Sequence, residues 1–175
     1  MPAYVMLFVA AALLLRLSTL YVSVKHEKAL KLAGATEYGA GNSVMLALAH
    51  TAFYIAAIAE GALRAAPWND ALSWLGMGLY GLAALALLAV IRSLGPLWTI
   101  KIIVSQSHRL VRSGLFRLVR HPNYLLNILP ELVGFALALN APVTLVIGVP
   151  LYLIPLFIRV RQEEAAMRRH FSDYA

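Results

Sequence analysis

Apolar residues fill most of this 175-residue chain, and polar stretches divide them into separate segments. A helix that crosses the hydrocarbon core of a bilayer needs about 20 apolar residues. Five segments reach or approach that length, and we expect each to be a membrane-spanning helix: residues 2–24, 43–66, 71–91, 122–139 and 141–158. The pattern therefore predicts an all-α integral membrane protein with five transmembrane helices.

The polar stretches between these segments complete the predicted organisation. Only the tripeptide NAP at 140–142 separates the last two segments, so we expect them to form an antiparallel helical hairpin. A basic connector runs from 92 to 121, and an amphipathic helix is predicted from about 159 to 174. The whole chain, 1–175, is predicted to be a single domain, with three spans and their loops in 1–91 and the connector, hairpin and final helix in 92–175.

Composition agrees with the membrane assignment. The chain is 61% hydrophobic and 13% charged, with a mean hydropathy of +0.75, which is more apolar than a soluble domain of this size. It has no cysteine, which excludes disulfides, thiolate metal sites and cysteine nucleophiles. The first apolar segment is too long for a signal peptide and lacks a basic leader, so we expect it to be a retained helix.

Basic residues are distributed unevenly between the two sides of the predicted membrane. Of the 15 Lys and Arg residues, 13 lie in the 25–42 loop, the 92–121 connector and the final helix, which five spans place on one side. The positive-inside rule makes that side cytoplasmic and puts the N-terminus outside. Membrane topology therefore explains the net charge of +7 without nucleic-acid binding.

A histidine–proline pair marks the start of the fourth segment, in the sequence RLVRHPNYL at 117–125. Proline keeps the preceding residue out of the helical region and suits a first helical turn, so we expect the helix to begin at Pro122 with His121 extended before it. The free N–H groups of such a helix start bind anions readily, and Tyr124 adds a phenol. Ordinary interfacial anchoring is an equally good interpretation of these residue types alone.

A second polar cluster follows the fifth segment, in the sequence RVRQEEAAMRRHFSDYA at 159–175. Glu164 and Arg168 are four residues apart with the acid first, the order that best stabilises a helix. Arg159 and Glu163 have the same spacing in the less favourable order, so helix stability explains Glu163 less well. We take Glu163 as the better functional candidate; the alternative for this cluster is an amphipathic helix on the bilayer surface.

The predicted hairpin brings the two clusters together. The start of its first helix and the end of its second lie on the same membrane face, so His121 and Arg159 flank the hairpin there. A basic helix start opposite a carboxylate suits a ligand that is zwitterionic and partly cationic.

These motifs, in this order, resemble the isoprenylcysteine carboxyl methyltransferase family. The segment SHRLVRSGLFRLVRHPNYL (107–125), the hairpin and then RVRQEE with a later Phe and Tyr follow the family pattern closely. One departure is Phe116, which stands where the family usually has tyrosine. EKALKLAGATEYG (27–39) and ALAHTAFYIAAIAEG (47–61) are similar to a bacterial subgroup that accompanies type III polyketide synthases and methylates alkylpyrone or alkylresorcinol lipids.

The resemblance implies an S-adenosylmethionine-dependent O-methyltransferase with its cofactor at the cytoplasmic face. The acceptor would be a carboxylate, phenol or enol oxygen of a lipophilic molecule, such as a prenylcysteine-like or alkylpyrone-like lipid. Arg159 would orient the acceptor oxyanion, and Glu163 would contact the cofactor or accept a proton. Carried over position by position, the cofactor contacts would be His108, Leu110, His121, Tyr124, Glu163 and Glu164.

Four further polar residues are candidates outside these motifs. Ionisable groups inside a membrane helix cost about 2.5–3.5 kcal/mol on insertion scales, so His50 is a candidate for substrate binding. Glu60 lies nearer the end of the same segment and is expected at the interface. Arg16 is expected to pack inside the bundle or against an acidic partner. Tyr38 is a candidate for the lipid entrance, with an amphipathic loop as the alternative.

Two other functions remain open at this point. One is an NADPH-dependent membrane reductase related to the sterol reductases, although the short connector and adjacent Glu163 and Glu164 do not favour a dinucleotide phosphate. The other is a membrane scaffold without enzymatic activity. The sequence indicates neither the identity of the acceptor nor the oligomeric state.

Overall fold

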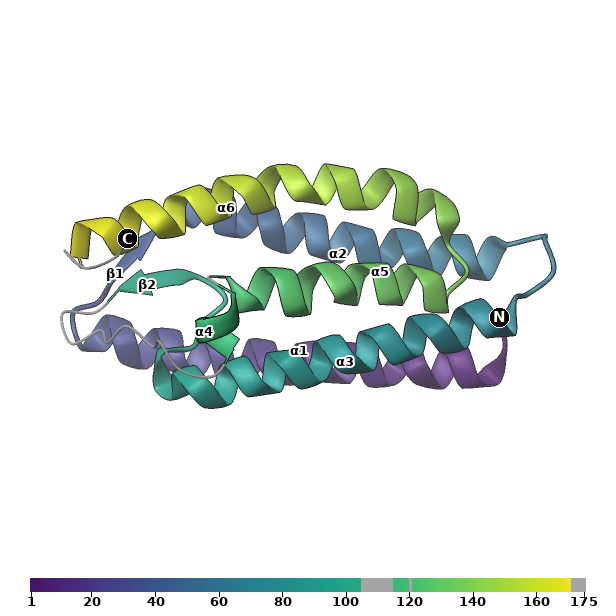
Figure 1. Cartoon of the computed structure of the whole chain (residues 1–175), viewed down its shortest axis with the longest axis horizontal. Helices are drawn as coiled ribbons and strands as arrows, with labels where there is room; N and C mark the ends of the chain where they lie inside the picture. Colours follow the sequence, from purple (N-terminus) through teal and green to yellow (C-terminus); the bar gives the residue numbers. More distant parts are fainter. Residues whose placement is uncertain (105–114, 120, 171–175) are drawn as a thin grey trace.

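The structure, a computed structural model, describes residues 1–104, 115–119 and 121–170, and apolar helices lying side by side form most of it (Figure 1). Within these residues four helices are long and apolar enough to cross a membrane, and a fifth apolar helix, Asn123–Ala138, is shorter. The predicted all-α membrane architecture is confirmed at this level. The elements are α1 (Ala3–Leu32), β1 (Thr36–Tyr38), α2 (Ala40–Leu63), α3 (Asp70–Leu94), η1 (Gly95–Leu97), β2 (Ile102–Val104), α4 (Leu115–Leu118), η2 (Asn123–Ile128), α5 (Leu129–Ala138), η3 (Thr144–Gly148) and α6 (Val149–His170).

The start of α1 and the end of α6 lie at opposite ends of the bundle (Figure 1). The end that carries β1, β2 and the end of α6 is called the sheet end below. The helix bounds lie within a few residues of the predicted segments, except that α1 continues past its apolar part to Leu32 and α6 continues to His170. Its extension, KHEKALKL, is rich in strong helix formers, which explains why it stays helical outside the apolar segment.

The predicted hairpin is present, and each of its helices begins with a π-helical segment. Segment η2 precedes Pro130 and segment η3 precedes Pro150. Proline has no N–H and its ring clashes with the carbonyl four residues earlier, so the wider π turn accommodates it. The backbone N–H of Leu129 accordingly bonds the carbonyl of Tyr124, five residues back.

The final helix differs from the sequence-based expectation. Residues 159–170 do not form a separate amphipathic helix but continue α6 without a break from Val149 to His170. Nothing in this stretch interrupts the helix, because its only internal proline, Pro155, lies earlier. The continuous helix carries Arg159 and Glu163 from the apolar part of α6 to the sheet end.

A two-stranded sheet at the sheet end was not predicted from the sequence. Strands β1 and β2 pair antiparallel, with Thr36 opposite Val104 and Tyr38 opposite Ile102. All three residues of β2 are buried, and Tyr38, Ile102 and Ala166 of α6 pack together. The sheet therefore joins the loop after α1 to the segment after α3 and holds both against α6.

Helix α5 is held in place by close packing on α3. A Cβ atom on Gly76 would stand 2.2 Å from the backbone nitrogen of Ala138, and one on Gly134 would stand 2.6 Å from that of Tyr80. Only glycine fits at such distances, so the two backbones lie in direct contact. This packing fixes the helix that carries Tyr124 at its start.

Candidate functional site

The centre of the site is a contact between the two clusters predicted from the sequence. Tyr124, at the start of the hairpin, donates its hydroxyl hydrogen bond to the carboxylate of Glu163 on α6. The helix begins at Pro122 as predicted, with the carbonyl of His121 accepting from the N–H groups of Tyr124 and Leu125. The hairpin therefore places the phenol and the carboxylate side by side.

His121 lies beside both carboxylates of α6. Its Nε2 is 3.4 Å from Glu164 Oε1, its Nδ1 is 3.9 Å from Glu163 Oε1, and its ring stacks on that of Tyr124. The Nδ1 atom is buried and has no hydrogen-bond partner among the described residues. The Glu163 side chain is 33% exposed, so this corner of the site is open on one side.

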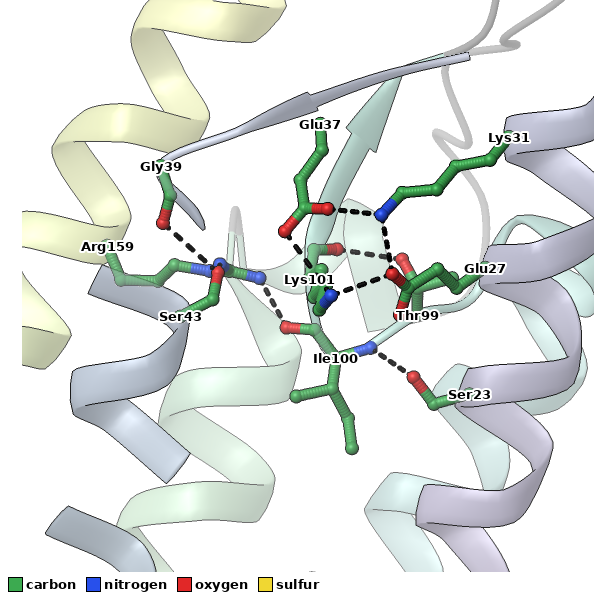
Figure 2. A network of polar contacts seen from close by, with 10 residues as sticks. All are labelled: Ser23, Glu27, Lys31, Glu37, Gly39, Ser43, Thr99, Ile100, Lys101 and Arg159. Atoms are coloured by element: carbon green, nitrogen blue, oxygen red, sulfur yellow. Dashed lines mark hydrogen bonds and ion pairs between the residues drawn. The ribbon is translucent and has the colours of Figure 1, made fainter. Parts of the chain in front are cut away.

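Arg159 has a different environment from the carboxylates. It is only 4% exposed, and its Nε donates to the Tyr124 hydroxyl at 3.3 Å. Its two terminal nitrogens donate to Ser43 Oγ of α2, at 2.7 Å, and to the carbonyl of Ile100 (Figure 2). Each of the three nitrogens thus has one acceptor within the protein, and three of the five N–H groups of the guanidinium are engaged.

The carbonyl that Arg159 binds belongs to a segment anchored on α1. The N–H of Ile100 donates to Ser23 Oγ at 2.8 Å, and the carbonyl of Trp98 lies 2.8 Å from His26 Nδ1 (Figure 2 for Ser23 and Ile100). Both anchors are on the last turns of α1. Arg159 therefore connects α6 to α2 through Ser43 and to α1 through this segment.

Two lysines and two glutamates form a network of ion pairs beside this segment (Figure 2). Lys101 and Lys31 each place Nζ 2.7 Å from Glu27, and both also approach Glu37 of β1, at 3.5 and 2.5 Å. Lys31 is 41% exposed, so solvent screens its share of these pairs. The network ties the end of α1 to both strands rather than forming a ligand site.

The remaining predicted site residues do not all join this centre. Tyr38 packs its ring edge-on against His170 at the end of α6, with ring centroids 5.7 Å apart. His50 lies inside the bundle, 3.5 Å from Glu131. The structure therefore separates the two residues predicted to bind substrate. His108 and Leu110 lie outside the described residues.

Three participants in these contacts were not recognised from the sequence. Ser43 and the Ile100 carbonyl carry no motif, and only the fold brings them to Arg159. Glu131 did carry a signal, because it is a carboxylate inside an apolar segment. It pairs with Arg16, which confirms the acidic partner expected for that arginine.

Glu60, expected at the interface, accepts from the N–H groups of Val143 and Thr144.

Comparison with known proteins agrees with the motif. The family model for isoprenylcysteine carboxyl methyltransferase (ICMT) matches residues 74–169. An uncharacterized protein of Haemophilus influenzae is 44% identical over 162 residues, which is 93% of this chain and 94% of that protein. The uncharacterized protein YpbQ of Bacillus subtilis is 28% identical over 172 residues, 94% of this chain and 96% of its own. No solved structure matches this chain. With a family match over more than half of its length, the chain belongs to the isoprenylcysteine carboxyl methyltransferase family.

Proposed function

We propose that this protein is an S-adenosylmethionine-dependent O-methyltransferase that acts on a lipophilic acceptor at the membrane boundary. The observation that carries the proposal is the contact of Tyr124 and His121 with Glu163, which joins the two halves of the family motif. The family supports methyl transfer in general terms. Cofactor, acceptor and residue roles are the parts that we propose.

The residues at the sheet end fit the cofactor's charges. S-adenosylmethionine would supply a methyl group on a positively charged sulfur, which becomes a neutral thioether when an acceptor oxygen takes the methyl group. Glu163 and Glu164 are part-exposed carboxylates that suit the cationic groups of such a molecule. The buried Nδ1 of His121, without a partner among the described residues, offers a further hydrogen bond.

We propose distinct roles for Glu163 and Arg159. Glu163 binds the cofactor or accepts the proton that a hydroxyl acceptor releases. Arg159 acts as a positioning residue, because its donors hold Tyr124, Ser43 and the Ile100 carbonyl. Positioned reactants gain effective molarities worth about 7–11 kcal/mol, so orientation by these residues can account for much of the catalysis.

The proposed membrane topology puts the sheet end in the cytoplasm and the N-terminus outside. It rests on the excess of Lys and Arg in the polar segments of the sequence and on counting the shorter helix Asn123–Ala138 as a span beside the four long ones of the described residues. A cytoplasmic sheet end would expose the carboxylates to the compartment in which S-adenosylmethionine is made.

Calorimetric titration of the detergent-purified full-length protein with S-adenosylhomocysteine tests the cofactor assignment. We expect micromolar binding that Glu163→Gln weakens roughly tenfold or more, as expected for a lost charge-assisted contact. Glu164→Gln tests the second carboxylate: because Glu164 also pairs with exposed Arg168, we expect its loss to weaken binding less than the loss of Glu163.

NADPH serves as the competing ligand in the same titration. Binding of NADPH without binding of S-adenosylhomocysteine would reject the methyltransferase and support a reductase. Failure of folded protein to bind either molecule would reject both enzymatic assignments and leave the scaffold.

A further inference from the structure

The end of the bundle opposite the sheet end contains a cavity that the proposed function does not use. The loop between α2 and α3 and the turn of the hairpin meet there (Figure 1). A partly open cavity of about 130 Å³ lies between them, far more than the roughly 10–15 Å³ that one water needs. Arg64, Asn69 and Asn140 line one part of this turn cavity, and apolar side chains such as Leu72 and Leu137 line the rest.

Hydrogen bonds hold the polar wall of the turn cavity in place. Asn140, in the hairpin turn, is 1% exposed and has a φ of 53°, a left-handed conformation that asparagine adopts more readily than most residues. Its side-chain oxygen accepts from the N–H of Asn69 at 2.9 Å, and its side-chain nitrogen donates to Ser73 Oγ at 2.8 Å. These bonds fasten the hairpin turn to the start of α3, so the cavity is preformed.

Arg64 provides the positive charge of the turn cavity. One terminal nitrogen donates to the carbonyl of Asn140 at 3.0 Å, and the other donates to that of Pro67 at the long distance of 3.5 Å. Two of the five N–H groups of the guanidinium thus have acceptors in the described part of the chain. Each terminal nitrogen keeps a second N–H group, and the pair can bind an anion with two parallel hydrogen bonds.

The acids at this end of the bundle are engaged elsewhere. Glu60 accepts two backbone hydrogen bonds at the start of η3, and the carboxylate of Asp70 accepts from the Tyr4 hydroxyl. The start of α3, where Asn69 lines the cavity, carries the positive end of the helix dipole. The polar part of the turn cavity therefore offers a cation and a positive helix end, which favour an anionic group.

The turn cavity lies at the level where a bilayer has its head groups. Arg64 directly follows the apolar helix α2, and Asn69 directly precedes α3, so both lie where spanning helices end. Trp74, which is 61% exposed, stacks on Tyr4 with ring centroids 5.0 Å apart. Tryptophan and tyrosine gather at the boundary between membrane and water, which agrees with this level. A phospholipid has its phosphate at the same level and its acyl chains beside the apolar wall.

We propose that the turn cavity binds the phosphate group of a phospholipid, with the Arg64 guanidinium as its main partner. The planar guanidinium matches the geometry of a phosphate better than a lysine ammonium does. The acyl chains of the lipid lie against the apolar wall that Leu72 and Leu137 form. This site is independent of the proposed methyl transfer, because Glu163 lies at the sheet end.

Native mass spectrometry of the delipidated, detergent-purified full-length protein with dioleoylphosphatidylglycerol tests this site. Dioleoylglycerol has the same chains without the phosphate, and glycerol 3-phosphate has the phosphate without the chains. Arg64→Gln removes the charge, and Leu72→Trp fills the cavity while leaving Arg64 in place. Leu75→Trp is the matched control, because Leu75 lies on the same helix and is 64% exposed. Thermal unfolding without lipid shows whether each variant is folded.

We expect one phosphatidylglycerol to bind, and dioleoylglycerol to bind roughly tenfold or more weakly, as expected for a lost charge-assisted contact. Arg64→Gln and Leu72→Trp should each weaken phosphatidylglycerol binding by a similar factor, and Leu75→Trp should leave it unchanged. Equal binding of dioleoylglycerol, or wild-type affinity in folded Arg64→Gln or Leu72→Trp, would overturn the site. Displacement of the lipid by equimolar glycerol 3-phosphate would overturn the phospholipid as its occupant, in favour of a water-soluble phosphate.

Discussion

The cluster at the sheet end and a deep cluster inside the bundle, formed by Arg16, His50 and Glu131, differ in how their charges are arranged. At the sheet end, two part-exposed carboxylates lie beside His121, and the buried cation Arg159 donates to three neutral oxygens. In the deep cluster, a buried carboxylate is directly paired with Arg16. The first arrangement leaves negative charge available to a ligand, and the second leaves none.

This difference indicates which cluster can bind a charged ligand and which one serves the packing of the helices. Charge that is left available at an opening favours a charged, water-soluble ligand, which suits the cofactor. Charge that is cancelled within the bundle leaves no net charge for a ligand, and removal of either partner would leave an unpaired buried charge. Substitutions in the deep cluster should therefore lower thermal stability, whereas substitution of Glu163 at the sheet end should lower activity.

The largest effect is expected from Glu131→Gln, which leaves Arg16 as an unpaired cation. Removing one partner of a buried ion pair costs about 3–5 kcal/mol, and the partial exposure of Arg16 favours the lower end. Thermal unfolding in detergent should show a clear drop in Tm. The double variant Arg16→Leu with Glu131→Leu should recover most of that loss; a double variant as unstable as the single one would contradict the pairing.

Glu163→Gln should lower activity and leave thermal stability nearly unchanged, the reverse of what we expect for Glu131→Gln. We expect methyl transfer to fall by about a hundredfold or more, the scale of a misplaced reacting group, with little change in Tm because the carboxylate is part-exposed. Activity and thermal unfolding are to be measured on the same preparations. A large loss of Tm with unchanged specific activity would make Glu163 a structural residue.

The close packing of α3 on α5 should make the protein sensitive to added side-chain volume at Gly76. In Gly76→Ala the new methyl group would meet the backbone of Ala138, so we expect a cost of about 1–3 kcal/mol from overpacking. Gly78→Ala, on the same helix, meets nothing within 4 Å and should be neutral or stabilising. Equal Tm values for the two variants would refute the close approach.

The smallest effect is expected from the lysine–glutamate network at the sheet end. Lys101→Gln removes two ion-pair contacts of a side chain that is 35% exposed. Pairs of this kind contribute about 0.2–1 kcal/mol and are screened by salt, so the loss of Tm should shrink as salt is raised. A salt-independent loss would mean that Lys101 acts through packing instead.

The sequence predicts the helices well because their signal is local. Long apolar segments and the proline at 122 place the spans, the hairpin and the contact of His121 with the carboxylates. Strand β2 is only three residues long, and its pairing with β1 depends on residues more than sixty positions away. Patterns in a short window carry no information on such a contact.

The environments of the site residues are less predictable than their positions. The motif predicts the position of Arg159, but it does not predict that Ser43 and the Ile100 carbonyl each accept a hydrogen bond from a terminal nitrogen of its guanidinium. Those partners come from two other elements and are set by the tertiary fold. Glu131 was predictable in principle, because a lone carboxylate in an apolar segment requires a partner.

Transfer of tritium from methyl-labelled S-adenosylmethionine into membrane lipid tests the central claim most directly. Membranes containing the wild-type protein, compared with those containing Glu163→Gln, are incubated with the cofactor and extracted into organic solvent. We predict label in the extract from wild type alone. Alkaline hydrolysis then identifies the acceptor oxygen, because a methyl ester releases the label and a methyl ether keeps it. Wild-type label no higher than that of Glu163→Gln would contradict the proposed methyl transfer at this site.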